Sequence, residues 1–333
     1  MPGILMFGPF TYALLRSGDI AVTDGWAPTD APWPSVVGAL VYSPNPQGDR
    51  AFRGRLYSKG VKRWSNLSDI LNFSRHDHDY ISAGLIPLAE VEEVLPQHRG
   101  CATESLDGLL RRRALEAVKL LSGCGIPPDD IGLYGSSAVG LRKRERDHGD
   151  LDLLVFGTQH YSAVVEACRG NRFDAGCVQL LFPHSRFELA ATARRLELSQ
   201  FRLNDGFRVD VKVIALQGNS IWTPSGKALK QGIPSTVHGF GQVVRADESL
   251  SMPARYVVRG GTGRMISIET HLFHLLGAAG QDDFVEFSGW KLDGNVVYLS
   301  DPNRHGIMRR DELIPRSLEA LHYPQQMTPP TMS

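Results

Sequence analysis

This 333-residue sequence has no net charge, no paired-cysteine motif and no long apolar run. Its 36 lysines and arginines balance 36 aspartates and glutamates, which argues against a surface that is basic everywhere and grips nucleic acid through charge alone. A local basic strip remains compatible with this balance. The four cysteines include no CxxC pair, which excludes a zinc ribbon on spacing. They are too few for a disulfide scaffold, so a reducing compartment fits.

Targeting and membrane signals are also missing. No apolar run approaches the roughly 20 residues that cross a bilayer. The apolar start of the chain lacks the positively charged segment of a secretory signal. Apolar residues at 42% and charged residues at 22% are ordinary values for a globular protein, which argues against wholesale disorder. We therefore expect a cytoplasmic protein without a membrane partner.

Three stretches with different patterns predict a mixed α+β protein. Residues 1–100 are rich in turns and short apolar runs, which predicts a β-rich α+β domain. Residues 101–220 alternate helical and strand patterns, which predicts an α/β layer structure with a mixed sheet. Residues 221–312 predict a small barrel or sandwich, with Asp293-Gly294 as a hairpin turn. The Pro-rich residues 313–333 predict a disordered tail.

Hydrophobic periodicity and breaker residues place the individual elements. In the first stretch, the expected strands are 20–23, 36–42 and 52–57, and the expected short helices are 66–73 and 88–95. In the second, the expected helices are 103–123, a short one from Ala138, 161–168 and 187–198, around strands 131–134, 151–156 and 207–216. Residues 141–150 are expected to form a charged loop. In the third, the expected strands are 255–259, 265–270, 284–292 and 295–300.

Three aspartates stand where two of these strands carry polar residues. Because side chains alternate faces along a strand, Asp150 and Asp152 point the same way, and Asp210 lies on the polar face of its own strand. If the two strands are neighbours, the three carboxylates converge on one patch. They repel each other unless a cation lies among them. Mg²⁺ is the expected occupant, since it prefers oxygen ligands and usually also holds substrate phosphates.

A turn that suits phosphate precedes the first aspartate pair. Gly135, Ser136 and Ser137 follow the strand at 131–134 and open a helix. Glycine lets the backbone approach a ligand, and the free N–H groups of a helix start attract anions. Arg142 and Arg144 lie in the charged loop that follows, where guanidinium groups can neutralise a triphosphate.

Taken together, GSSAVG, GDLDLLVF and FRVDVKV resemble the signature of the nucleotidyltransferase superfamily that includes DNA polymerase beta. The resemblance covers about a quarter of the chain, and it implies a nucleotidyltransferase core. It also implies that Asp150 and Asp152 bind two Mg²⁺ ions, with Mn²⁺ as an alternative. Asp210 would join the catalytic ion and help to take the proton from an attacking hydroxyl.

Two functions follow as expectations. The first is an enzyme that transfers a nucleoside monophosphate from an NTP to a hydroxyl acceptor and releases pyrophosphate. The acceptor stays open between an RNA 3′ end, a protein side chain and a small metabolite. The second is a non-catalytic module that senses a nucleotide or holds a partner. His76 and His78 have the spacing of metal ligands, but a solvated loop is the preferred interpretation because no further ligand accompanies them.

Overall fold

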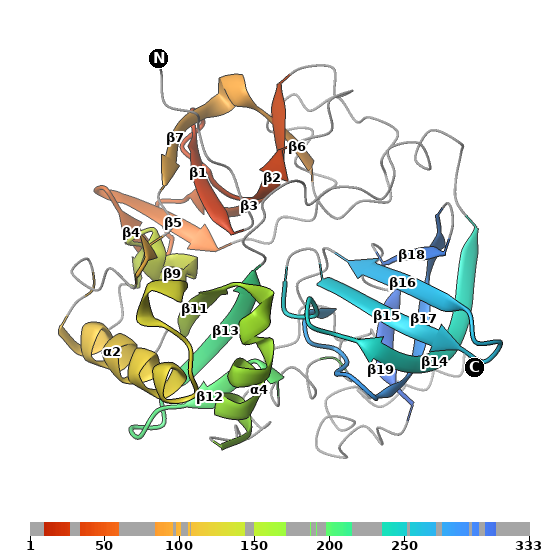
Figure 1. Cartoon of the computed structure of the whole chain (residues 1–333). Coiled ribbons are helices and arrows are strands. Elements are labelled where there is room, and N and C mark those ends of the chain that lie inside the picture. The colour runs from red at the N-terminus through yellow and green to blue at the C-terminus, as the bar shows by residue number, and fades with distance from the viewer. Residues whose placement is uncertain are drawn as a thin grey trace, which may run out of the picture.

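The computed structural model describes residues 10–26, 34–59, 84–95, 98–100, 106, 108–143, 150–170, 187, 191, 198–214, 235–251, 254–270, 275–292, 295–299 and 304–310. They form a mixed α+β structure with three sheets, as Figure 1 shows. We call these the N-terminal sheet (β1–β7 and β10), the central sheet (β8, β9 and β11–β13) and the C-terminal barrel (β14–β19). Within the described ranges, no helix is long and apolar enough to cross a membrane.

The N-terminal sheet has eight strands in the order β10-β4-β5-β3-β2-β1-β7, with β6 paired to β3. Its own strands are β1 (Thr11–Leu15), β2 (Ile20–Trp26), β3 (Ser35–Pro44), β4 (Arg50–Phe52), β5 (Arg55–Lys59), β6 (Gly84–Pro87) and β7 (Val91–Leu95). A 3-10 turn at Leu88–Glu90 links β6 directly to β7, so the sheet curls back on itself (Figure 1). Every residue of β1 is buried, because one face lines the interior of this curl and the other packs on the rest of the molecule.

The structure extends the expected strands at 20–23 and 36–42 and corrects two other expectations. Residues 52–57 are not one strand, because Arg53 and Gly54 both have positive φ (47° and 77°) and form the tight turn between β4 and β5. Residues 88–95 are not a helix, because Val91–Leu95 pairs with β1 as strand β7. The expected helix at 66–73 and the pair His76 and His78 lie outside the described residues.

The central sheet has the order β12-β13-β11-β9-β8. Its strands are β8 (His98–Arg99), β9 (Ile131–Tyr134), β11 (Leu151–Phe156), β12 (Gln200–Arg202) and β13 (Arg208–Ile214). β11 and β13 are parallel, and the other pairs are antiparallel. Helices α2 (Gly108–Gly123) and α4 (Tyr161–Gly170) share one apolar core with the Leu153 and Val211 face of the sheet. The opposite face carries the polar residues described below.

Most expected elements of the central segment are confirmed, and two are corrected. The short helix α3 spans Gly135–Ala138, so it begins at the glycine rather than at Ala138. Arg142–Lys143 is not loop but strand β10, which pairs with β4 at the edge of the N-terminal sheet. Of the expected helix 187–198, the structure describes only Phe187, Ala191 and Leu198, each of them helical and buried.

The C-terminal segment forms a closed five-stranded barrel. The strands pair in the ring β14-β15-β16-β18-β17 and back to β14, with β19 added beside β17. Their bounds are β14 (Thr236–Arg245), β15 (Ala254–Gly260), β16 (Met265–Thr270), β17 (Phe284–Lys291), β18 (Val296–Leu299) and β19 (Gly306–Arg309). The expected barrel and the β17–β18 hairpin are confirmed, whereas the sequence reading missed β14 and β19. Residues 311–333, which include the expected tail, lie outside the described residues.

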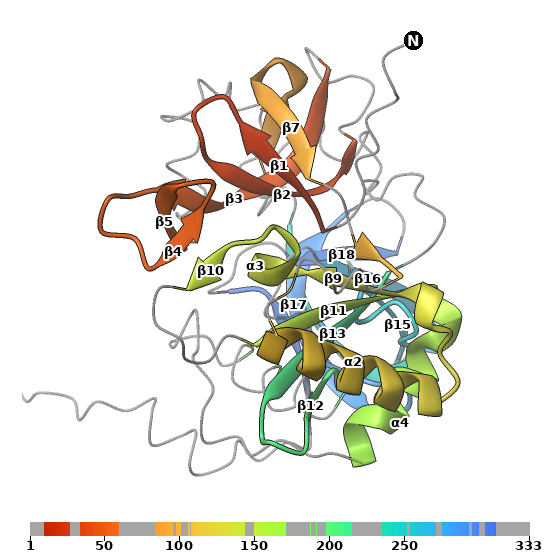
Figure 2. The same ribbon diagram turned by 90° about the vertical axis from the view of Figure 1, so that its left-hand side faces the viewer.

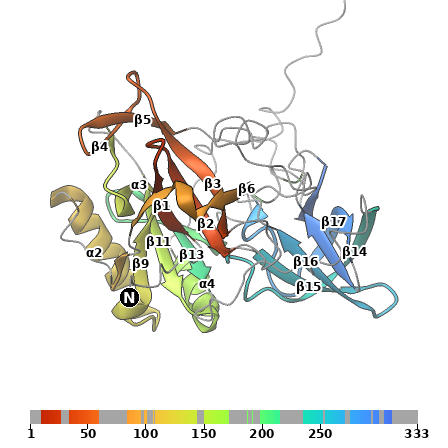
Figure 3. The same ribbon diagram turned by 90° about the horizontal axis from the view of Figure 1, so that it is seen from above.

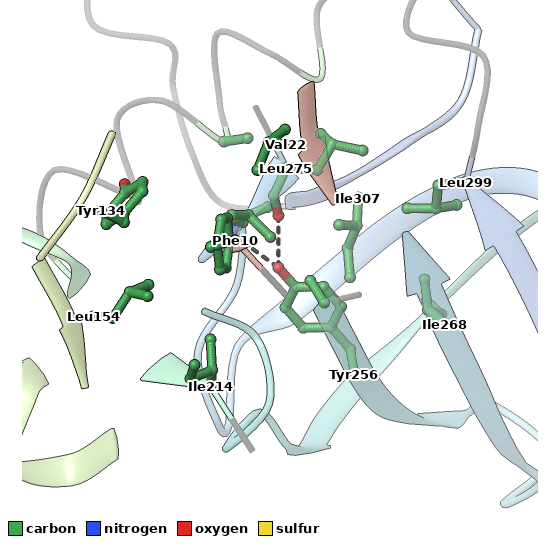
Figure 4. Close-up of a cluster of buried hydrophobic side chains, with 14 of the residues drawn as sticks. Phe10, Val22, Tyr134, Leu154, Ile214, Tyr256, Ile268, Leu275, Leu299 and Ile307 are labelled. Atoms are coloured by element: carbon green, nitrogen blue, oxygen red, sulfur yellow. Dashed lines mark hydrogen bonds between the residues drawn. The ribbon is translucent and has the colours of Figure 1, made fainter. Parts of the chain in front are cut away.

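The three sheets meet in one shared apolar core. Figure 4 shows Phe10 and Val22 from the N-terminal end beside Ile214 of the central sheet and Tyr256 of the barrel. The buried Tyr256 hydroxyl donates a hydrogen bond to the Leu275 carbonyl at 2.7 Å and accepts one from the Ala278 N–H at 3.1 Å. Figure 3 shows the barrel beside the central sheet, and Figure 2 shows α3 and β9 directly beneath the N-terminal sheet. The N-terminal sheet therefore lies over the edge of the central sheet where the candidate site residues are found.

Candidate active site

Four polar residues form one row across the polar face of the central sheet. Asp152 on β11 is the register partner of Asp210 on the parallel strand β13. On the outer sides, Asp210 pairs with Gln200 of β12 and Asp152 pairs with Tyr134 of β9. Since register partners point to the same face, the two carboxylates are neighbours. The sequence-based expectation that their strands are adjacent and share a face is confirmed.

Asp210 is the most constrained of the three carboxylates, with only 12% of its side chain exposed. Gln200 Nε2 donates to its Oδ2 at 2.6 Å, and Lys212 Nζ donates to its Oδ1 at 3.1 Å. The Tyr134 hydroxyl also donates to Oδ1, at 3.4 Å. The amide oxygen Oε1 of Gln200 is buried and has no hydrogen-bond partner. The carboxylate is thus held in one orientation, beside an acceptor atom that is still unsatisfied.

Asp150 immediately precedes β11 and forms an ion pair with Arg208 of β13. About a third of each side chain is exposed, 34% for Asp150 and 33% for Arg208. Burial raises the pKa of the Asp150 carboxyl, but the Arg208 guanidinium outweighs it and the pKa is lowered below its usual value. Asp150 is therefore an anion turned toward a protein cation.

Asp152 forms no ion pair with the described residues, and its electrostatics are the opposite of those of Asp150. Burial first, and then the negative charges of Asp150 and Asp210, raise the pKa of its carboxyl well above the usual value. Lys212 is nearby on the same face, with its ammonium 4.1 Å from the centre of the Tyr134 ring. Burial and the neighbouring Lys59 ammonium lower the pKa of Lys212 to about 7. A further cation at this place would stabilise the ionised form of Asp152.

The Gly135-Ser136 turn packs directly on Asp152. Gly135 has a φ of +74°, a conformation that other residues rarely adopt, and a β-carbon there would collide with the Asp152 carboxylate. The position therefore needs glycine for two independent reasons. Ser136 and Ser137 follow on α3, both half-buried. The turn that the sequence predicts for phosphate thus lies directly against the Asp152 carboxylate.

Two tyrosines of the N-terminal sheet contact the same turn. The Tyr12 hydroxyl lies near the Gly135 backbone N–H and the Tyr42 hydroxyl lies near that of Ser136, and each neighbour favours the ionised form of its tyrosine. Burial, with the nearby Asp152 charge contributing, raises the pKa of both tyrosines. Both hydroxyls therefore stay protonated at neutral pH and act as neutral hydrogen-bonding groups.

The donor set fits a hard divalent cation, although the carboxylates are not gathered around one point. Over the described part of the chain, no three His, Cys, Asp or Glu side chains form a group that could hold a metal ion as they stand. The geometry explains this, since Asp150 is turned to Arg208 and Asp210 is held by Gln200 and Lys212. The ligand chemistry itself suits Mg²⁺, since the row carries the carboxylates of Asp152 and Asp210 and, beyond Asp210, the amide oxygen of Gln200.

The expected phosphate-binding arginines are placed less completely. Arg142 lies on β10, and only its backbone position is described. Arg144 lies outside the described residues. The sequence reading missed Gln200 and assigned no site role to Tyr12, Tyr42 or Lys59. Arg208 and Lys212 could have been predicted as site residues, because they flank Asp210 on the polar face of its strand.

Comparisons with known proteins add no further constraint. No family model, curated protein or solved structure matches this chain.

Proposed function

We propose that the protein is a nucleotidyltransferase that transfers a nucleoside monophosphate from an NTP to a hydroxyl-bearing acceptor. The observation that carries this proposal is the register pairing of Asp152 with Asp210, together with the Gly135 turn packed on the Asp152 carboxylate. Carboxylates brought together beside an anion-attracting turn suit a reaction of metal-bound phosphates. The central sheet would then be a nucleotidyltransferase core, flanked by the N-terminal sheet and the C-terminal barrel.

Asp150, Asp152 and Asp210 are the residues that would hold Mg²⁺ or Mn²⁺. Two such ions would supply charge neutralisation for the triphosphate and a lower pKa for the acceptor hydroxyl. The chain's own part is to position the reactants. The Gly135 backbone and the Ser136 and Ser137 hydroxyls face the phosphates, with Arg142 and Arg144 as candidate further contacts.

Proton removal from the acceptor falls to Asp210 in this proposal. Gln200 and Lys212 fix its carboxylate, so one oxygen can be directed at a hydroxyl without reorganisation. The unsatisfied Gln200 Oε1 lies beside it and can accept a hydrogen bond from the same hydroxyl or from a water. The acceptor class stays open between an RNA end, a protein side chain and a small metabolite.

One observation favours a second function, a non-catalytic nucleotide-binding or partner-binding module. Each of Asp150 and Asp210 already has a protein cation beside it, and the Gly135-Ser136 turn already has tyrosine partners. A site satisfied in this way could serve as a scaffold. We rank it below the enzyme, because Asp152 is buried beside two further carboxylates that disfavour its ionised form, a cost that a bound cation would relieve and that a pure scaffold has no reason to carry.

The test is incubation with the four α-labelled NTPs and Mg²⁺ in the presence of cellular RNA, protein and metabolite fractions. We expect pyrophosphate release and label transfer to one fraction, both abolished by Asp210→Asn. Asp282→Asn, on an exposed turn outside the site, is the matched control and should transfer normally. If no pyrophosphate is released with any NTP and any fraction, the enzymatic function is refuted and the binding module remains.

A further inference from the structure

One face of the N-terminal sheet points at the candidate site and carries two cations. Tyr42 of β3 is the register partner of Lys59 on β5, so the two share a face. Tyr57 lies two residues before Lys59 on the same face, and it pairs with Arg50 of β4. Arg50 and Lys59 therefore lie on the face that bears Tyr42, at neighbouring positions of a continuous antiparallel sheet.

This face is pressed against the Gly135-Ser136 turn. The Tyr42 hydroxyl reaches Ser136, and the Arg50 guanidinium carbon lies 5.7 Å from the centre of the Tyr42 ring. Strand β10, which follows the turn in the chain, also pairs with this sheet, because Lys143 is the register partner of Arg50. The segment that follows the turn is thus built into the same sheet as the two cations.

Both cations keep hydrogen-bonding capacity that the described residues do not satisfy. Lys59 is exposed, and it forms no ion pair with a carboxylate of the described residues. Its charge still reaches Asp150 and Asp152, whose carboxyls it stabilises as anions. Arg50 binds Asp49 through Nη1, but its Nε is buried and has no hydrogen-bond partner among the described residues. Because buried donors are normally hydrogen-bonded, this guanidinium N–H is available to an acceptor from a ligand.

The chemistry of the proposed substrate supplies that acceptor. Three carboxylates and a triphosphate carry more negative charge than two divalent ions neutralise, so further cations are needed near the terminal phosphates. Arg208 and Lys212 serve the carboxylates from the central sheet. Within the described residues, Lys59 and Arg50 of the N-terminal sheet are cations on the face that bears Tyr42, beside the turn.

We propose, resting on the nucleotidyltransferase function above, that Lys59 and Arg50 bind the β- and γ-phosphates of the nucleoside triphosphate. The triphosphate then lies between the Gly135-Ser136 turn and this face of the N-terminal sheet. Tyr42 marks the same subsite, because it shares a face with Lys59 and its hydroxyl lies near that of Ser136. The N-terminal sheet is in this way a substrate-binding part of the site.

The experiment measures dissociation constants for a non-hydrolysable NTP analogue and for the matching nucleoside monophosphate, with Mg²⁺, by calorimetry. Lys59→Ala should weaken the triphosphate about ten- to a hundred-fold, the usual effect of losing a contact to a charged group. It should leave the monophosphate within about twofold, because that ligand has no β- or γ-phosphate. Lys59→Arg should restore most of the affinity. Lys119→Ala, an exposed lysine on α2, is the matched control and should bind both ligands as the wild type does.

The outcomes separate the two proposals. If the wild type binds no NTP analogue in a Mg²⁺-dependent way, the nucleotidyltransferase proposal and this one fall together. If the wild type binds and Lys59→Ala binds equally well, only the subsite is refuted. Equal weakening of triphosphate and monophosphate also refutes it, since the lysine would then act elsewhere on the nucleotide. Lys59 is exposed, so its variants should fold; Arg50→Lys tests the second cation without emptying a buried position.

Discussion

The Asp152 carboxylate lies so close to the Cα of Gly135 that no β-carbon fits between them. Gly140 lies five residues later, just after α3. Its φ is +73° against +74° for Gly135, but the space around it is open. The two glycines therefore separate the effect of backbone strain from the effect of the carboxylate.

For this reason Gly135→Ala should destabilise the protein more than Gly140→Ala. We expect about 1 kcal/mol for Gly140→Ala from the positive φ alone, and about 2 kcal/mol more for Gly135→Ala. Urea unfolding of both variants measures the difference. Combining Gly135→Ala with Asp152→Ala should recover much of the extra loss. Equal destabilisation by the two glycine variants would show that the carboxylate does not constrain position 135.

Asp152→Asn should raise the stability of the metal-free protein. Burial, and then the neighbouring carboxylates, disfavour the ionised side chain, so a neutral amide of the same size should raise the melting temperature at neutral pH. The variant should also lose the rise in melting temperature that Mg²⁺ with NTP gives the wild type. Paired melting curves provide the measurement, with Asp282→Asn as the unaffected control. The same ligand-dependent rise in Asp152→Asn would remove Asp152 from the metal site.

Lys212→Met should show that a metal ion and this lysine compensate the same charge. Removing the ammonium deletes a hydrogen bond to Asp210 and leaves a nearly buried carboxylate without it, at a cost of about 2 kcal/mol. Mg²⁺ should then stabilise Lys212→Met by more than it stabilises the wild type. Thermal unfolding across a Mg²⁺ series tests this, with Lys119→Met as the control. A Mg²⁺ response equal to or below that of the wild type would contradict the prediction.

Tyr256→Phe tests the core that joins the three sheets. The change leaves the buried Leu275 carbonyl and Ala278 N–H without their hydrogen-bond partner, which should cost about 1–3 kcal/mol of stability. Tyr57→Phe, also a buried ring, should cost less than about 0.5 kcal/mol, because its hydroxyl makes no such pair of hydrogen bonds with the described residues. Urea unfolding measures both. A Tyr256→Phe midpoint unchanged from that of the wild type would show that this hydroxyl adds nothing to the shared core.

The part of the site that lies on local strands could be predicted from sequence. Alternation along a strand places Asp152 and Asp210 on the polar faces of their strands, and that parity holds in the structure. The parts that depend on distant pairing could not. Tyr42 and Lys59 reach the site only because β3 and β5 pair in one particular register, and no local pattern specifies a partner so far along the chain.

The same limit explains the errors in secondary structure. Residues 88–95 have an apolar spacing compatible with a short helix, but β1 offers a strand edge and the segment pairs with it. Arg142–Lys143 looks like charged loop by composition, and it becomes a strand because the outer edge of β4 lies alongside. Gln200 was missed because a three-residue strand such as β12 has too few residues to show alternation.

The pairing of β10 with β4 also has a consequence for synthesis and dissection of the chain. The ribosome releases residues 50–59 long before residues 142–143, so the outer edge of β4 stays open while the intervening chain is made. An open strand edge can recruit a second chain. A fragment that stops before residue 142 would keep that edge permanently bare and should associate with copies of itself. Strand β10, which follows the Gly135-Ser136 turn, thus covers the outer edge of a sheet whose other strands come much earlier in the chain.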